Sequence, residues 1–100
     1  MSRKALDAEL RTFGIDNVYF QPPPNLQMVY DCFVYELSDI HTNNADDMTY
    51  RLLHRYQVTL VTRKYNEELI DTIMHHFNRI TFARPYRSDN LYHTVFYIYY

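Results

Sequence analysis

The chain has 100 residues, enough for one domain with a single modest core, and 47% of them are hydrophobic, which excludes a disordered chain. Its 10 Lys and Arg against 12 Asp and Glu argue against a protein that binds its partner mainly by neutralising phosphates. The single cysteine, Cys32, cannot form an internal disulfide, and no leader-like or membrane-spanning apolar run is visible, so we expect a soluble domain inside the cell.

The first predicted element is an amphipathic helix over Ser2–Phe13, with Ser2 as its N-cap. Leu6, Leu10 and Phe13 recur at the spacing of one helix face. Gly14 is the only glycine of the chain, and it stands where a residue in the left-handed conformation would end the helix.

Two strands are predicted next. A short one covers Asn17–Gln21 and ends at the prolines 22–24, because proline cannot donate a hydrogen bond to a β-ladder. A longer one covers Leu26–Leu37, and apolar residues occupy both of its faces, which favours a central strand or a strand covered by a neighbouring subunit. Asp31 interrupts this pattern and indicates a bulge or an edge.

The stretch Ser38–Thr49 is polar and rich in turn-forming residues, so it is predicted to be a long loop. Its Asp and Asn residues superficially resemble a cation loop, but an EF-hand needs a central Gly and a final Glu that this stretch lacks. Long loops in small domains are often functional. We therefore expect this loop to contact a neighbouring subunit or another protein.

The clearest strand is Arg55–Arg63, where β-branched and aromatic residues alternate with a period of two. A helix with one apolar stripe is predicted over Glu67–Arg79, capped by Asn66. Ile80–Phe82 is predicted to be a short connector or the start of a strand, Ala83–Asn90 a turn region, and Leu91–Tyr100 a final strand. The order α-β-β-β-α-β predicts a single α+β domain, with about four mainly antiparallel strands and two helices packed on the sheet.

The sequence shows no pattern typical of a catalytic, cofactor or metal site. The five histidines include no His-x3-His pair, and a single glycine excludes a Gly-rich phosphate loop. Cys32 lies in an apolar strand, where a buried and inert thiol is expected. We therefore predict that the protein is not an enzyme and needs no cofactor.

Tyrosine is the unusual component, with 11 Tyr and no Trp. Its apolar ring and polar tip suit half-buried strand positions, and equally suit an oligomer interface that is wet before assembly and dry afterwards. Both interpretations stay open for Tyr97 and Tyr99 of the last strand. A small nucleic-acid-binding module that stacks bases on these two rings is a further alternative, although the chain has no RNP1-like run.

A series of segments carries a resemblance to a known family. In chain order they are VYFQPPP, MVYDCFVYEL, NNADDMTY, YQVTLVTR, an Arg-Pro-Tyr segment and DNLYHTVFYIYY. They resemble the tail terminator proteins, also called tail completion or tail-to-head joining proteins, of long-tailed bacteriophages. The residues that match the family's motifs are Met28, Tyr30, Cys32, Ala45, Asp46, Tyr50, Asn90, Leu91, Tyr92 and His93. Asp31 departs where the family has Pro, and Asp47 departs where it has Asn.

The resemblance covers nearly the whole chain and implies a structural virion protein, which is expected to form a hexameric ring in the tail neck. Such a ring ends tail-tube polymerisation and joins the tail to the head connector. The implied partners are further copies of the chain, the tail tube protein and a head-closure or connector protein, and DNA passes through the lumen without specific binding. The implied location is the virion, and the host cytoplasm during assembly. Another neck protein, a head-closure protein or head-tail adaptor, is the alternative. The expected protein-interface residues are His41, Asn43, Asn44, Asp46, Asp47, Tyr50, Tyr97 and Tyr99.

Overall fold

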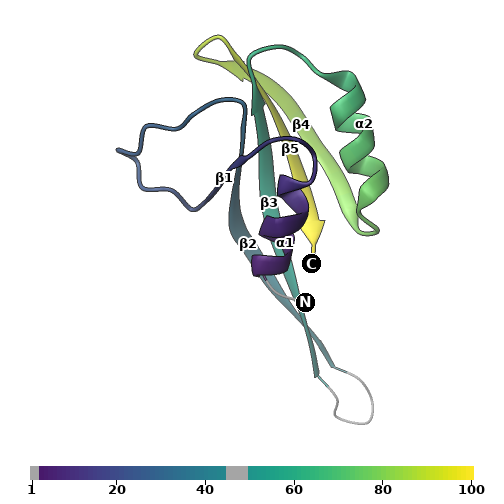
Figure 1. Cartoon of the computed structure of the whole chain (residues 1–100). Helices are drawn as coiled ribbons and strands as arrows, with labels where there is room; N and C mark the ends of the chain where they lie inside the picture. Colours follow the sequence, from purple (N-terminus) through teal and green to yellow (C-terminus); the bar gives the residue numbers. More distant parts are fainter. Residues whose placement is uncertain (1–2, 45–49) are drawn as a thin grey trace.

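The computed structural model of the chain describes residues 3–44 and 50–100, with the side chains of 41–44 and 50–52 left out of the description. Its helices and strands form one mixed sheet with both helices on the same face, as Figure 1 shows. The elements are α1 (Arg3–Arg11), β1 (Asn17–Phe20), β2 (Cys32–Asn44), β3 (Tyr50–Thr62), α2 (Glu67–His76), β4 (Ile80–Ser88) and β5 (Leu91–Tyr99). The strands lie in the order β1-β2-β3-β5-β4, so the predicted α+β class is confirmed and the sheet has five strands, not four.

The pairing of the strands places β3 at the centre of the sheet. β3 pairs antiparallel with β2 on one side and with β5 on the other. β1 adds to β2 as a parallel edge strand, and β4 adds to β5 as an antiparallel edge strand. Residues far apart in sequence are therefore hydrogen-bonded neighbours, for example Val58 with both Tyr35 and Phe96.

The fifth strand corrects the predicted turn region over Ala83–Asn90. Residues Ile80–Ser88 form β4, and only Asp89 and Asn90 remain as the turn, at φ 53° and 63°. Positive φ at both residues of a two-residue connection is typical of a type I′ hairpin turn, which matches the twist of the flanking strands. The alternating pattern of β4 is hidden by a register shift between Phe82 and Arg84 and by the proline that follows it.

Two other predicted boundaries move. The strand expected over Leu26–Leu37 begins at Cys32, and it runs on to Asn44, so most of the predicted loop over Ser38–Thr49 is strand. The bulge that was expected at Asp31 occurs instead between Leu37 and Asp39. Polar residues extend β2 because this part of the hairpin is paired with β3 alone, where a strand needs no apolar face.

Both helices begin and end for local reasons that the sequence shows. In α1, Leu6 and Leu10 are fully buried one turn apart, and Gly14 follows at φ 85°, as predicted. The cap predicted for α2 is confirmed, because the Asn66 side chain accepts a hydrogen bond from the Leu69 N–H. α2 ends at His76, three residues earlier than predicted. The N-cap predicted at Ser2 lies outside the described residues.

The core lies between the sheet and the two helices. Alternate residues of the three inner strands point into it and meet the buried faces of α1 and α2. The two helices also meet each other, since the ring centroid of Phe13 on the α1 side lies 5.1 Å from that of His76. The fully buried large side chains are Tyr35, Phe33, Phe96, Leu6, Leu10, Leu60, Ile73 and Ile98.

Candidate interaction surface

The opposite face of the sheet carries no helix in the described part of the chain, and we call it the open face. Its central row crosses all five strands in register and is completed by a second row toward the β4–β5 turn. The central row is mixed apolar and polar and consists of Tyr19, Val34, Thr59, Val95 and Arg84; the second row consists of Asn17, Cys32, Val61, His93 and Tyr86. Cys32, Val61 and Val95 are buried by their neighbours within the chain, so the accessible part of this face consists of its partly exposed polar and aromatic side chains.

A third row centres on Tyr97, one of the residues predicted to lie at an interface. Its hydroxyl donates to Oε1 of Gln57 at 3.5 Å, and the guanidinium carbon of Arg55 lies 4.7 Å from the centroid of its ring. Arg55 also donates through Nη2 to the Ser38 hydroxyl at 3.2 Å. The ring of Tyr97 is therefore held in place by Arg55 and Gln57, and part of its surface is still exposed.

Two buried polar atoms on the open face lack a hydrogen-bond partner among the described residues. They are Nε of Arg55 and Nε2 of His93. The His93 ring stacks on Tyr86, with centroids 4.5 Å apart and an interplanar angle of 9°. Both atoms are enclosed by side chains of the same chain.

The long hairpin formed by β2 and β3 extends beyond the sheet at the bottom of Figure 1. β5 pairs with β3 only as far as Arg55, so residues 50–54 of β3 have β2 as their strand neighbour on one side and none on the other among the described residues. The molecule is elongated as a result, with a longest dimension of 51 Å.

The predicted interface residues fall into two groups in space. His41, Asn43 and Asn44 belong to β2 and pair with Leu53, Arg51 and Tyr50 of the long hairpin, while Asp46 and Asp47 lie outside the described residues. Tyr97 and Tyr99 belong to β5 and lie on the open face, alternating with Phe96 and Ile98, which point into the core. The two groups therefore lie on one sheet, and their contact with another subunit stays a prediction.

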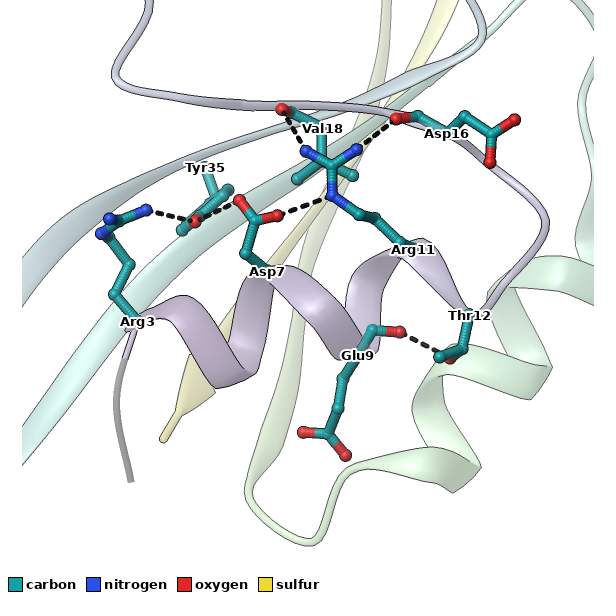
Figure 2. Close-up of polar contacts among 8 residues, drawn as sticks. All are labelled: Arg3, Asp7, Glu9, Arg11, Thr12, Asp16, Val18 and Tyr35. Atoms are coloured by element: carbon teal, nitrogen blue, oxygen red, sulfur yellow. Dashed lines mark hydrogen bonds and ion pairs between the residues drawn. The ribbon is translucent and has the colours of Figure 1, made fainter.

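A polar network fixes α1 to the sheet and to the segment that leads into β1, as Figure 2 shows. The Tyr35 hydroxyl donates to Oδ2 of Asp7 at 2.8 Å and accepts from Nη1 of Arg3 at 3.2 Å. Oδ1 of the same Asp7 carboxylate pairs with Nε of Arg11 at 2.8 Å, and Arg11 Nη1 donates to the carbonyl of Asp16 at 2.6 Å. Arg11 Nη2 also lies 3.5 Å from the Val18 carbonyl, to which it donates, so this network ties α1 to β1.

The electrostatics of this network favour the neutral form of the tyrosine. Burial, and then the hydrogen bond to Asp7, raise the pKa of Tyr35 to about 12, and Arg3 opposes the shift only in part. The hydroxyl therefore keeps its proton at physiological pH and stays a donor to the carboxylate.

Cys32 is buried as predicted, at the start of β2. Burial, with a smaller contribution from the Asp31 carboxylate, raises the pKa of its thiol to about 11. A thiol that stays protonated at neutral pH is a poor nucleophile and a poor metal ligand. Within residues 3–44 and 50–100, no group of three or more His, Cys, Asp or Glu is placed to hold a metal ion.

The sequence analysis missed several residues of the open face. Arg55 and Gln57 belong to the strand predicted best, but their contact with Tyr97 depends on strand pairing that no local pattern reveals. Arg84 and Tyr86 were missed because Ala83–Asn90 was predicted to be a turn, whereas β4 runs from Ile80 to Ser88. One of the two alternatives for Ile80–Phe82, the start of a strand, agrees with the structure.

No helix in the described part of the chain is long and apolar enough to cross a membrane. No protein-family model, curated protein or solved structure matches the chain.

Proposed function

We propose that this protein is a structural virion protein of the tail terminator class, whose copies close into a ring, six in number, at the end of a phage tail. The ring stops polymerisation of the tail tube and presents the surface that joins the head connector. It acts without catalysis or a cofactor, and DNA passes through its lumen without specific binding. The protein resides in the virion neck and in the host cytoplasm during assembly.

The observation that carries the proposal is the open face. One subunit leaves a whole side of a five-stranded sheet without a helix in its described part, with half-buried aromatic side chains such as Tyr97 and Tyr19. A neighbouring subunit that covered this face would bury the exposed parts of these rings. A face that is covered by a different surface of the next copy gives a heterologous contact, which closes into a ring when the rotation permits.

The order of the segments supports the same proposal. The motifs that resemble the family lie at the entry to β2, in the β2–β3 hairpin and at the turn into β5, and Asn90 occupies the turn itself. Asp31 stands where the family has a proline, and its side chain accepts a hydrogen bond from the Arg63 N–H at 2.9 Å. This hydrogen bond fixes the entry to β2, as the rigid ring of a proline would.

An early stop codon in this reading frame tests the proposal, with electron microscopy of the lysate as the measurement. We expect filled heads beside unattached tails of uncontrolled length. Tails of normal length with leaking or unjoined heads would indicate a head-closure protein or head-tail adaptor instead, and normal virions would refute both roles.

Complementation by variants then tests the open face. Thr59 lies in the middle of the central row and is partly exposed. Thr59→Asp places a charge there and should fail to complement, whereas the matched control Thr59→Ser should complement. Equal complementation by both variants would show that the face is not covered in the tail.

A nucleic-acid-binding module remains the second candidate, and one observation favours it. The guanidinium carbon of Arg84 lies 5.4 Å from the centroid of the Tyr86 ring, and that of Arg87 lies 4.8 Å from the centroid of the Tyr92 ring. Proteins that bind single-stranded nucleic acid also combine Arg with aromatic rings, on which the bases stack. Salt-dependent binding of a single-stranded oligonucleotide by the purified protein would support this candidate, and its absence would remove it.

A further inference from the structure

We propose that the β2–β3 hairpins of neighbouring copies pair edge to edge, so that residues 50–53 of β3 in one copy lie beside residues 41–44 of β2 in the next. This inference rests on the proposed ring and names one contact that closes it. Repeated around the ring, the contact joins all the hairpins into one sheet that closes on itself and leaves no free edge.

Beyond the main sheet, both edges of the hairpin lack a strand neighbour among residues 3–44 and 50–100. β1 pairs with β2 only between Cys32 and Tyr35, and β5 pairs with β3 only as far as Arg55. The two free edges lie on opposite sides of the hairpin, which extends from the sheet at the bottom of Figure 1. An unpaired strand edge offers its backbone N–H and C=O groups to another strand.

On β3, the free edge begins where β5 ends. The carbonyl of His54 accepts a hydrogen bond from the Tyr100 N–H at 3.0 Å, so the backbone groups of His54 face the side of β5. Backbone direction alternates along a strand, so those of Leu52 and Tyr50 face the same side, and no other described strand pairs with them there. Tyr100 occupies the His54 carbonyl, and an added strand therefore stops short of His54.

On β2, side chains occupy the edge close to the sheet and leave only its outer part for pairing. The Leu37 N–H donates to Oε1 of Gln21 at 3.2 Å, and the Ile40 N–H donates to Oδ1 of Asp39 at 2.8 Å. An added strand would need these N–H groups, so it is confined to the residues beyond Ile40. The bulge between Leu37 and Asp39 bends β2 at this point, which lets the outer hairpin contact a neighbour while the sheets of the two copies diverge.

The free parts of the two edges lie at the same level of the hairpin. Thr42 is the cross-strand partner of Leu52, and Asn44 is the partner of Tyr50. Their backbone groups face away from each other, so one pair of residues serves both edges. A closed ring has no rise from one copy to the next, and the β3 edge of one copy can therefore meet the β2 edge of the next without a shift along the hairpin.

Charge selects the hairpin of a second copy as the strand that adds. Residues 36–44 of β2 include Glu36 and Asp39 but no Lys or Arg, and residues 50–55 of β3 include two Arg but no Asp or Glu. Pairing a β2 edge with a β3 edge brings opposite charges together, whereas pairing two equal edges would bring like charges together. The contact is therefore heterologous, as a ring requires, and it is antiparallel because all hairpins of a ring point the same way.

Proline substitution at one outward-facing position of each edge tests this contact, with native mass spectrometry and sedimentation velocity as the measurements. Thr42→Pro removes an N–H from the β2 edge and Leu52→Pro removes one from the β3 edge, and neither N–H faces the other strand of its own hairpin. Each variant alone should associate at least roughly tenfold more weakly than the wild type, because the edge loses a donor and the proline ring stands where the added strand would lie. Thr42→Val and Leu52→Val keep the N–H, so these matched controls should associate like the wild type.

A mixture of the two proline variants gives the sharper result. Thr42→Pro keeps an intact β3 edge and Leu52→Pro keeps an intact β2 edge, so each mixed pair forms one contact and we expect a dimer that grows no further. Oligomers of wild-type size from each proline variant alone would overturn the inference and leave the proposed ring in place.

Hydrogen exchange tests the contact without any substitution. The amides of Thr42 and Leu52 should exchange at least roughly tenfold more slowly in the wild-type oligomer than in the dilute monomer, because they become hydrogen-bonded between copies. Equal exchange in both would show that the copies associate through another surface, which overturns the inference. A wild type that stays monomeric at every concentration would also overturn it, and the electron microscopy of the early-stop lysate would then decide the proposed function separately.

Discussion

Replacing Tyr35 by Phe removes one hydroxyl from the network that holds α1 on the sheet. Tyr35 is fully buried, and its hydroxyl serves Asp7 and Arg3 at once. A hydrogen bond to a charged group contributes about 1.5–3 kcal/mol to stability. The Asp7 side chain keeps 21% of its surface exposed and also keeps its ion pair with Arg11. We therefore expect Tyr35→Phe to lower the free energy of unfolding by about 1.5 kcal/mol at neutral pH, the lower end of that range.

The pH dependence of this difference follows from the raised pKa of Tyr35. The value is about 12 in the folded chain, against an ordinary value of 10. Below pH 10 the hydroxyl is neutral in both states, so its full contribution to stability is present. As the pH rises from 10 through 12, the unfolded chain loses this proton first, and the contribution disappears. The difference in stability between wild type and Tyr35→Phe should therefore shrink across this window.

Urea unfolding followed by circular dichroism measures both effects, at neutral pH and at steps between pH 10 and 12. The contributions of the other tyrosines are common to both proteins and cancel in the difference. Tyr65→Phe is the matched control, since Tyr65 is 56% exposed and its hydroxyl can be solvated by water. A Tyr35→Phe variant as stable as the wild type at neutral pH, or a difference that persists unchanged to pH 12, would refute this account of the network.

Two further predictions concern the ends of the helices. Gly14 has φ 85° and no neighbouring atom within 4 Å of where a Cβ would stand, so Gly14→Ala should cost about 1–2 kcal/mol through backbone strain alone. Thermal unfolding checks this, and Gly14→Asn should recover part of the loss; equal stability of Gly14→Ala and wild type would contradict the assigned conformation. Asn66→Ala removes the acceptor of the Leu69 N–H and should destabilise the chain by about 1 kcal/mol, measured by urea unfolding. Asn66→Asp keeps the acceptor, and a loss as large as that of Asn66→Ala would show that the cap is unimportant.

The elements that the sequence predicts well are those with local causes. Gly14 ends a helix because of its own backbone freedom, Asn66 caps one with its own side chain, and the alternation in β3 requires only one buried face. β4 was missed because its bulge and its proline break the alternation, and an edge strand with exposed side chains has no apolar face to reveal it. Beyond Phe82 no local alternation indicates the strand, and its pairing with β5 determines its course.

In the candidate site, too, the features with local causes could be predicted from the sequence and those that depend on strand pairing could not. Tyr97 and Tyr99 could be selected from the alternation of the last strand, which also predicts that they share a face. The contacts of Arg55 and Gln57 with Tyr97, and the free edges of the β2–β3 hairpin, depend on which strands are neighbours. Those neighbours are set by packing of the whole domain, and no short stretch of the sequence encodes them.

The irregular shape of β4 affects how readily separate chains could aggregate through the edges of their sheets. Pro85 offers no N–H to an incoming strand, and the register shift next to Arg84 interrupts the straight edge that a templated β-ladder needs. At the other edge, β1 is only four residues long, and from Glu36 onward β2 itself forms the edge. The β4 edge is therefore protected from templated pairing, whereas the long β2–β3 hairpin is the part of the sheet where another strand could add.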